Sequence, residues 1–432
     1  MRKQIYTFSK NGYRKLFCNN CTQNTFLHIR MQEICAQHAD ETVCFTASLQ
    51  QFVTTNRRKN AKAYCKCRRN LIYLKLAKTA VTQVWRSKGE QHMKKSKKVL
   101  IILGSIVLAI VVVFGVCTIF AHSQNDRSQP TESLNNWMSF IKDETLLKKL
   151  AIPGAHDAGT AGISYLAETQ DKDTATLLAC GTRYFDLRVS KQGDELKIYH
   201  GPFVGVKLND VLNACKQFLT IRTSEMLILD FQHFENDAQA ATLEMFCNVF
   251  DNDSLVVCNN TNESDEKFID TLTLGQCRGK ALVVWGRDTS KFDNNFVFQR
   301  NNDEGTRENS VLHSYYYSDL NKKSSKAYIE TALPTYIDLY KQQGNGLFVL
   351  QGQLTDGLFV FGPRFREASH NKNMNAYVQS LNNGGDLDII NIVMRDFVSA
   401  RKNCLTIQLN QAKGNVKEAA KTAFEQMIAE NS

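Results

Sequence analysis

Two histidines have the sequence surroundings that are richest in possible chemistry. His156 lies in the stretch IPGAHD and His200 in the stretch IYHGP, with Arg188 of YFDLRV between them in the chain. An imidazole titrates near neutral pH, so a pair of them can accept and release a proton within one catalytic cycle. A guanidinium can bind phosphate oxygens through paired hydrogen bonds and neutralise charge in a transition state. This combination favours cleavage of a phosphodiester.

Carboxyl and amide side chains accompany these three residues at the ends of apolar runs. They are Asp157, Asp186, Asp230, Gln232 and Asp396. A carboxylate that accepts a hydrogen bond from a catalytic histidine fixes its tautomer. A single histidine at a strand end is usually structural, so the prediction of a site depends on the whole set. His233 follows Gln232 directly, and strand alternation predicts that it faces away from the site as a structural residue.

Short apolar runs alternate with helical patterns over about 300 residues, and these elements must position the set. The candidate strands are 149–152, 184–189, 197–199, 226–231, 281–285, 347–351 and 389–394, and the candidate helices include 174–179, 208–219 and 238–250. Such alternation predicts an α/β fold with a mostly parallel sheet closed as a barrel. In such barrels the reactive residues lie at the carboxyl ends of the strands.

An uncharged apolar segment precedes this domain. Residues 99–121 contain no charged side chain, and four lysines lie within residues 94–98. Residues 1–98 contain 21 basic and 4 acidic residues, whereas the remainder contains 32 and 39. This pattern predicts one transmembrane helix, a cytoplasmic N-terminus and an extracytoplasmic catalytic domain. Met93 followed by lysines also resembles the start of a signal peptide, which would give a secreted protein. A buried core helix is the remaining alternative.

The sequence therefore divides into four parts. Residues 1–92 form a basic, poorly ordered region, which is not translated if Met93 is the true start. Residues 93–122 form the signal anchor or signal peptide, 123–135 a linker, and 136–432 the barrel domain. Sequons begin at Asn252, Asn259 and Asn262, and Cys247 with Cys258 is the candidate disulfide pair. The paired cysteines at 18 and 21 and at 65 and 67 lack zinc-finger spacing.

Residues 136–410 resemble the X-domain family of phosphatidylinositol-specific phospholipases C, in its calcium-independent, bacterial-type or X-domain-containing branch. The matching stretches are NWM at 136–138, IPGAHDAGT at 152–160, TQD at 169–171, GTRYFDLRV at 181–189, YHGP at 199–202, SEMLILDFQHF at 224–234 and VMRDFV at 393–398. The resemblance implies an irregular TIM barrel that cleaves phosphatidylinositol-type lipids to diacylglycerol and inositol 1,2-cyclic phosphate.

The resemblance also implies a role for each catalytic candidate. His156 resembles the general base that deprotonates the inositol 2-hydroxyl, and Asp396 the carboxylate that orients it. His200 resembles the general acid that protonates the leaving diacylglycerol oxygen. Arg188 resembles the phosphate-binding arginine. Asp157 and Asp186 match supporting carboxylates, Asp157 on the side of the leaving group.

No metal or other cofactor is expected. The calcium-dependent branch carries Asn after the first catalytic histidine and acidic residues in the strand that here contains Asp186 and Arg188, so a fixed cation replaces a calcium ligand. Gln232 stands where the bacterial branch has lysine. Gln232 and Arg287 are the candidate substrate-binding residues, and Tyr315, Tyr316 and Tyr317 are interpreted as pocket-wall packing.

The expected partners are an inositol phospholipid and a membrane surface, with no nucleic acid, and the protein is expected to be a monomer. Three alternatives stay open. The barrel could bind inositol phosphates or lipid head groups without turnover, it could be a metal-dependent glycerophosphodiesterase, or the chain could be a structural or adhesive membrane protein.

Overall fold

The computed structural model describes residues 95–123 and 130–432, apart from positions 252, 291, 293, 303, 304, 306, 322, 323 and 356–361. The predictions made for residues 1–92 and for Asn252 lie outside these ranges. The chain divides into two units at Gly104, and the barrel belongs entirely to the second.

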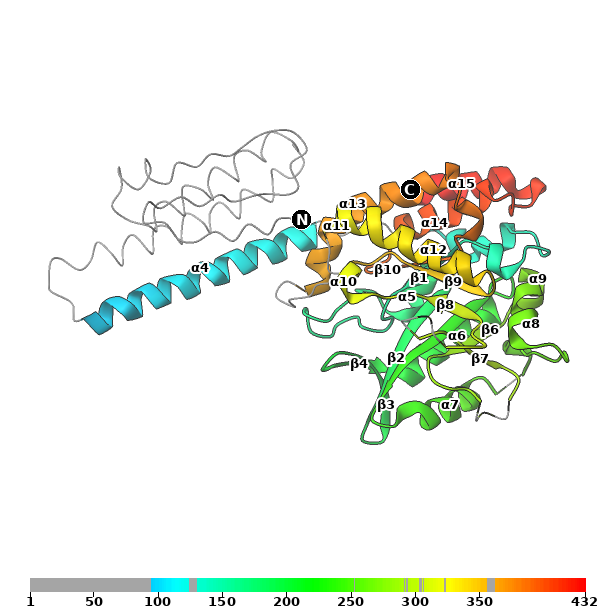
Figure 1. Ribbon diagram of the computed structural model, residues 1–432, viewed down its shortest axis with the longest axis horizontal. Coiled ribbons are helices and arrows are strands. Elements are labelled where there is room, and N and C mark those ends of the chain that lie inside the picture. The colour runs from blue at the N-terminus through cyan, green and yellow to red at the C-terminus, as the bar shows by residue number, and fades with distance from the viewer. Residues whose placement is uncertain are drawn as a thin grey trace. The chain divides into compact units, whose positions relative to one another are not determined.

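Helix α4 (Lys95–Ser123) contains the apolar segment found in the sequence (Figure 1). Its stretch Leu100–Ile119 has a mean hydropathy of 3.1, and none of it is buried. An exposed apolar helix of this length is long enough to cross a bilayer. The structure thus confirms a candidate membrane span, whereas its orientation and its cleavage stay predictions.

Eight parallel strands form a nearly closed barrel (Figure 1). In spatial order they are β7 (Val297–Gln299), β6 (Ala281–Trp285), β5 (Leu227–Glu235), β2 (Tyr184–Gln192), β1 (Ile152–Ala155), β10 (Ile392–Arg395), β9 (Leu347–Gln351) and β8 (Leu312–Ser314). A single parallel bridge between Arg300 and Leu312 joins the two ends of this order. The fold is an irregular TIM barrel, as the sequence predicted.

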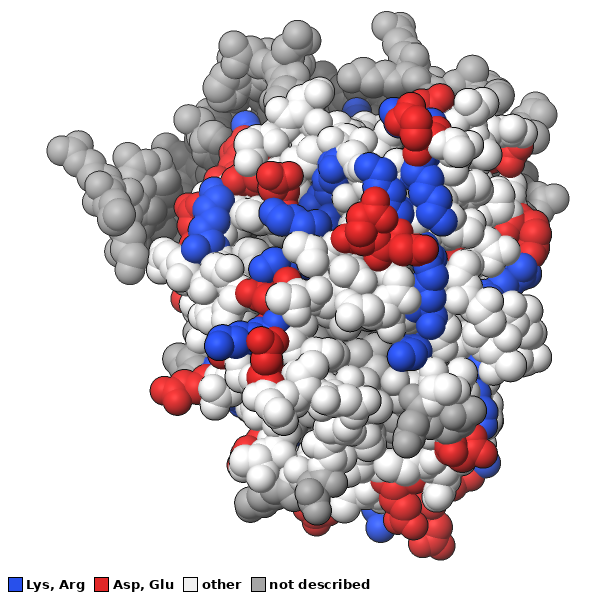
Figure 2. Space-filling model, turned by 90° about the vertical axis from the view of Figure 1, so that its right-hand side faces the viewer, with Lys and Arg blue, Asp and Glu red and all other residues white. Residues whose placement is uncertain are grey.

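Helices cover the outside of the barrel. They are α5 (Thr174–Ala179), α6 (Leu208–Ile221), α7 (Ala238–Val249), α8 (Asp265–Thr271), α9 (Leu274–Cys277), α10 (Ser318–Asn321), α11 (Ser325–Ala327), a π-turn (Tyr328–Ala332), α12 (Leu333–Gln343), α13 (Gly362–Ser380), α14 (Ala400–Ala412) and α15 (Lys421–Asn431). Single 3₁₀ turns occur at Leu147–Lys149, Asp253–Leu255, Leu381–Asn383, Leu387–Ile389 and Glu418–Ala420. In α6, Leu208, Leu212 and Cys215 follow the spacing of one helix face, and all three are buried against the sheet. On the face shown in Figure 2, basic and acidic side chains lie close to one another.

The amino end of the barrel is closed by the segment that precedes β1. Within the 3₁₀ stretch Leu134–Phe140, the Trp137 indole Nε1 donates to Gly181 O at 3.0 Å. The Met138 amide donates to Glu225 at 3.1 Å, and Glu225 forms a fully buried ion pair with Arg183. A buried charge needs such pairing. The NWM stretch therefore anchors the chain at the end opposite the predicted site.

Three sequence predictions about local structure are corrected. The run 197–199 belongs to β3 (Glu195–His200), which pairs antiparallel with β2 and with β4 (Phe203–Lys207) instead of joining the parallel barrel. The β2–β3 turn around Gly193 is too short for a parallel crossover. The first strand begins at Ile152, after a 3₁₀ turn, not at 149. Cys247 is an exposed, unbridged thiol on α7, so its predicted disulfide with Cys258 is wrong.

Candidate active site

Neighbouring strands bring His156 and Asp396 together although they are 240 residues apart. His156 directly follows β1 and Asp396 directly follows β10. The two strands are parallel, with Ala155 paired to Arg395, so the residue after each strand emerges at the same edge. His156 Nδ1 lies 2.7 Å from Asp396 Oδ1. A carboxylate accepts, so Nδ1 carries the proton and Nε2 faces the site.

The charge environment of His156 favours its protonated form. Burial opposes a charge on the imidazole, but the carboxylates of Asp157 and Asp396 outweigh that effect and raise the pKa of His156 to about 9. Burial raises the pKa of the Asp396 carboxyl, and the His156 charge opposes that rise.

Buried charges outside the barrel position Asp396. The Lys402 ammonium, from α14, donates to Asp396 O at 3.1 Å and to Phe397 O at 2.9 Å. It also contacts the carboxylate of Glu367 on α13, and Arg395 donates to the same carboxylate at 3.4 Å. All of these side chains are at most 5% exposed. The backbone that carries Asp396 therefore accepts charge-assisted hydrogen bonds from a buried ammonium.

Gln170 connects the same two strand ends. Its amide Nε2 donates to His156 O and to Arg395 O, both at 2.9 Å, and its Oε1 accepts from Val398 N at 3.1 Å. The side chain is fully buried. Sequence reasoning did not assign Gln170 a role, although the matching stretch TQD contains it. Gln170 is a positioning residue, because these hydrogen bonds of its side chain join it to the backbone of both strand ends.

Backbone strain marks both strand ends. Asp157, after His156, has φ +44°, and Phe397, after Asp396, has φ +45°. Non-glycine residues rarely adopt this left-handed region, and such conformations persist where the surrounding contacts impose them. The Asp157 amide donates to Asp186 Oδ2 at 3.2 Å, and the Phe397 amide donates to Thr169 O at 2.7 Å. These contacts fix the direction in which each reactive side chain points.

His200 reaches the same space from the hairpin, as the last residue of β3. Its Nδ1 donates to Ala167 O at 2.6 Å, which leaves Nε2 directed at the site. The Asp157 carboxylate lies between the two imidazoles, because its Oδ2 is 3.4 Å from His156 Nε2 and 3.6 Å from His200 Nε2. The two rings are 6.5 Å apart between centroids.

Arg188, on β2, completes the cluster. Its Nε contacts Asp157 Oδ1, its Nη2 lies 3.6 Å from Asp186 Oδ2, and the same Nη2 lies 3.3 Å from His156 Nε2. Burial alone would raise the pKa of Asp157, but the positive charges of Arg188 and of the neighbouring histidines hold it well below its usual range. Asp157 is fully buried, and these positive charges keep its carboxylate ionised at the centre of the site.

The structure thus places all six predicted catalytic residues in one cluster. A tetrahedral phosphate is small enough to contact two imidazole nitrogens whose rings are 6.5 Å apart while meeting a guanidinium beside them. The arrangement offers a proton acceptor, a proton donor and an anion-binding group around one point.

His156, Asp157 and Asp186 could also hold a metal ion, because their ligand atoms lie within 4.8 Å of one another. Arg188 contacts both carboxylates of this trio. A fixed guanidinium there repels a divalent cation and occupies the oxygens that calcium would need. The donor set therefore fits calcium poorly, and metal-independent chemistry stays a prediction.

The two predicted substrate-binding residues lie in different surroundings. Gln232 is 7% exposed within β5, and its Oε1 has no hydrogen bond among the described residues. Arg287 is exposed and lies two residues after β6. Burial raises the pKa of Tyr199 on β3, and the positive charge of Arg287 opposes that rise. Tyr315 packs in the core with Tyr336 and Phe348, as wall packing predicted.

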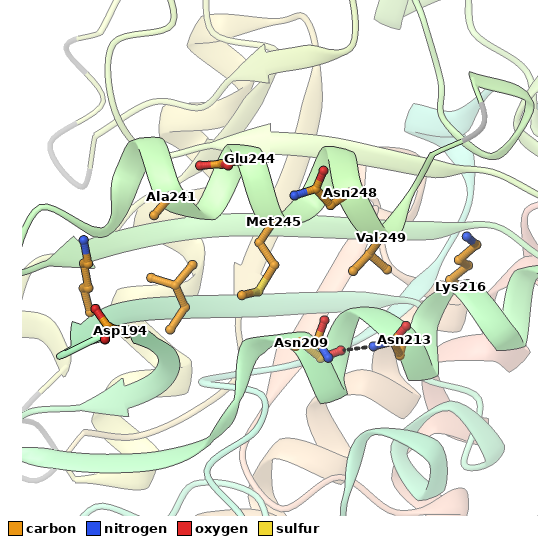
Figure 3. A pocket seen from close by; sticks show the side chains of 11 residues that line it. Asp194, Asn209, Asn213, Lys216, Ala241, Glu244, Met245, Asn248 and Val249 are labelled. Carbon is orange, nitrogen blue, oxygen red and sulfur yellow. Dashed lines mark hydrogen bonds between the residues drawn. The ribbon is translucent and has the colours of Figure 1, made fainter.

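A separate groove on the outside of the barrel contains none of these residues. It lies between α6 and α7, where Asn209 and Asn213 lie across from Met245 and Val249 (Figure 3). The chemistry predicted from the sequence therefore does not coincide with this groove.

Comparison with known proteins gives the cluster a family context. Residues 147–286 match the family model for the phosphatidylinositol-specific phospholipase C X domain. The 1-phosphatidylinositol phosphodiesterase of Listeria monocytogenes is 31% identical over 184 residues, which cover 40% of this chain and 56% of that protein. The human PI-PLC X domain-containing protein 2 is 37% identical over 119 residues, covering 20% and 39%. The chain spans about half the length of the curated relatives it matches.

A solved structure shows the same architecture. The phosphatidylinositol-specific phospholipase C from Listeria monocytogenes aligns with a TM-score of 0.52 and 24% identity, over 64% of this chain and 98% of that one. At this identity the likeness to this structure concerns the barrel fold, and the family match concerns residues 147–286, which are similar to the X domain of the phosphatidylinositol-specific phospholipases C.

Proposed function

We propose that this protein cleaves the phosphodiester of phosphatidylinositol-type lipids by general acid–base catalysis, without a metal ion. The convergence of His156, Arg188 and His200 around the Asp157 carboxylate is the observation that carries the proposal. The names of the similar proteins support the substrate class.

In the first half of the proposed step, His156 Nε2 removes the proton of the inositol 2-hydroxyl. The freed oxygen attacks phosphorus and forms the new O–P bond of a five-membered ring. Asp396 keeps the imidazole in the required tautomer and stabilises the charge that it acquires, through the 2.7 Å hydrogen bond at Nδ1.

In the second half, the P–O bond to diacylglycerol breaks and His200 Nε2 gives its proton to the departing oxygen. The products are inositol 1,2-cyclic phosphate and diacylglycerol, with no net change in protons. Arg188 stabilises the negative charge on the non-bridging oxygens. The Asp157 carboxylate, whose Oδ2 lies 3.6 Å from His200 Nε2, faces the nitrogen from which this proton is given.

The membrane is the proposed working surface. Helix α4 would anchor the barrel with the basic residues 1–98 on the cytoplasmic side and the barrel outside, or it would be removed as a signal peptide. The proposed division of the chain is the one drawn from the sequence, with a catalytic domain at 136–432.

Metal-dependent phosphodiester cleavage is the second candidate, because the trio His156, Asp157 and Asp186 has ligand spacing. It requires that an ion displace Arg188 from two carboxylates. Calcium titration after treatment with a chelator separates the two candidates, since activation by the ion supports the second alone.

The test of the proposal is turnover of phosphatidylinositol by the full chain in mixed micelles, followed by ³¹P NMR. A five-membered cyclic phosphodiester should appear with diacylglycerol, and should be absent with the His156→Ala variant. A folded wild-type protein that releases neither product would refute the proposal and favour a barrel that only binds head groups.

A further inference from the structure

Strand β5 contains a bulge beside the candidate site. Along the β2–β5 pairing, Leu187 lies opposite Phe231, and the next residue, Arg188, lies opposite His233. Gln232 is therefore the extra residue of the bulge. The sequence analysis assumed that side chains alternate without interruption along this strand, and it therefore predicted that His233 faces away from the site. The register shift overturns that prediction, because paired residues of adjacent parallel strands extend from the same face of the sheet.

The neighbouring strand is built to accommodate this bulge. The amide of Gly286, directly after β6, donates to Phe231 O at 2.8 Å. A Cβ atom at position 286 would lie 1.9 Å from Gln232 O, which is impossible for any residue but glycine. Gly286 thus allows the displaced Gln232 carbonyl to pass close to its backbone. The bulge is consequently supported by two strands, and the position of His233 follows from both.

The electrostatics of the cluster agree with this placement. Arg188 extends into the cluster, where it contacts Asp157 and Asp186, and His233 lies beside Arg188 on the same face. The charges of His233, Arg188 and the two catalytic histidines all lower the pKa of Asp157. His233 is also partly exposed, unlike the buried Gln232.

We infer that His233 is a third imidazole of the site, which binds the anionic oxygens of the substrate phosphate together with Arg188. Gln232 cannot supply positive charge, and the residue after it does so because the bulge brings it to the same face as Arg188. This inference rests on the proposed function for the identity of the substrate, but it concerns phosphate binding and not proton transfer.

The test compares three variants of the full chain. His233→Gln removes the charge and retains polar volume, and His233→Lys retains a cation. Lys191→Gln, on the exposed end of β2, makes the same change in net charge away from the site. Each is measured for kcat/KM on phosphatidylinositol in mixed micelles and for affinity toward inositol 1-phosphate by calorimetry, with circular dichroism to verify folding.

His233→Gln should lower both kcat/KM and inositol 1-phosphate affinity roughly 10- to 100-fold, the range for losing a hydrogen bond to a charged group. His233→Lys should recover most of this loss, and Lys191→Gln should match wild type. Folded His233→Gln protein with wild-type affinity would overturn the inference, as would His233→Lys protein that is folded but no better than His233→Gln.

The two measurements separate this inference from the proposed function. If wild type binds inositol 1-phosphate and His233→Gln does not, while neither turns over lipid, His233 binds phosphate in a barrel without the proposed activity. If wild type turns over lipid and His233→Gln is equally active with equal affinity, the proposed function stands and the inference fails.

Discussion

The two sides of the candidate site are built differently. His156 belongs to the barrel wall, bonds to a buried carboxylate, and has a side chain that is 11% exposed. His200 ends an antiparallel hairpin strand, bonds to the backbone oxygen of Ala167, and has a side chain that is 21% exposed. Behind Asp396 lie the charges of Lys402 and Glu367. On the side of His200, the support is a loop.

The difference suits the two proposed roles. A general base must be oriented before the reaction, and its charge must be stabilised as it forms, so it benefits from a fixed carboxylate. A general acid must meet a leaving group attached to a bulky lipid, and the greater exposure of His200 suits that role. The base side should therefore be sensitive to distant substitutions, and the acid side should depend mainly on His200 itself.

The largest effect is expected from the imidazoles. His156→Ala and His200→Ala should each lower kcat by about 10²–10⁴-fold, because each removes a general acid–base step. Initial rates on phosphatidylinositol micelles measure the loss, and Lys191→Gln serves as the unaffected control. Near-normal rates in either variant would show that the corresponding side of the site is not catalytic.

Asp396→Asn should reduce kcat/KM at pH 7 about 10²-fold or less, and should change the pH profile. His156 acts as a base only when neutral, so its pKa of about 9 places the ascending limb of wild-type kcat/KM at alkaline pH. Losing one of the carboxylates that raise this pKa should shift the limb to lower pH. Asp388→Asn, on the exposed segment before β10, is the matched control. An unshifted limb in Asp396→Asn would separate Asp396 from His156.

The free energy of unfolding should also depend on the titration of His156. The folded pKa of about 9 lies above the unfolded value near 6.5. The contribution of His156 to folding is therefore complete below pH 6.5 and is lost as pH rises through about 9. Urea unfolding at pH 6 and pH 9.5 should show a larger loss for wild type than for His156→Gln. Equal losses would contradict the electrostatic account of the base side.

Lys402→Met tests the sensitivity of the base side to residues outside it. The substitution should lower kcat about 10-fold by releasing the backbone of Asp396. It should cost up to about 3–5 kcal/mol of stability, because the buried Glu367 carboxylate loses Lys402 and retains only the longer contact with Arg395 among the ion pairs of the described residues. Adding Glu367→Gln should restore much of the stability but not the rate. Full recovery of the rate in the folded double variant would make Lys402 a purely structural residue.

On the acid side, Ala167→Ser should change kcat less than about 3-fold, since the hydrogen bond from His200 is to the backbone oxygen of Ala167, which the substitution retains. The comparison with Lys402→Met is made on the same micelles. A loss as large as that of Lys402→Met would mean that the hairpin side is as tightly constrained as the barrel side.

The smallest effect is expected from metal removal. Rates after dialysis against a chelator should equal untreated rates, because Arg188 occupies the carboxylates that an ion would need. A loss that calcium restores would favour metal-dependent chemistry at His156, Asp157 and Asp186.

The sequence sufficed for the barrel and for the members of the cluster, because catalytic side chains in this fold lie at strand ends, and strand ends can be recognised from apolar runs. The pairing of β1 with β10 brings Asp396 to His156. From the sequence, this contact could be predicted only through the family resemblance. Local periodicity cannot predict a neighbour 240 residues away.

Three further features were not predicted from the sequence pattern, each for its own reason. Alternation of side chains assumes an unbroken strand, so the bulge at Gln232 reversed the predicted direction of His233. The run 197–199 was counted among the strands of the mostly parallel barrel, because the short turn at Gly193 was not used to exclude a parallel crossover. Lys402 and Glu367 were missed because long-range ion pairs leave no periodic signal.

The assignment of His156 as the general base and His200 as the general acid is tested most directly by changing the leaving group. On a nitrophenyl ester of inositol phosphate, whose leaving group needs no proton, His200→Ala should recover most of the rate that it loses on phosphatidylinositol, whereas His156→Ala should stay inactive. Recovery by His156→Ala, or equal losses of His200→Ala on both substrates, would contradict the assignment of His156 as base and His200 as acid.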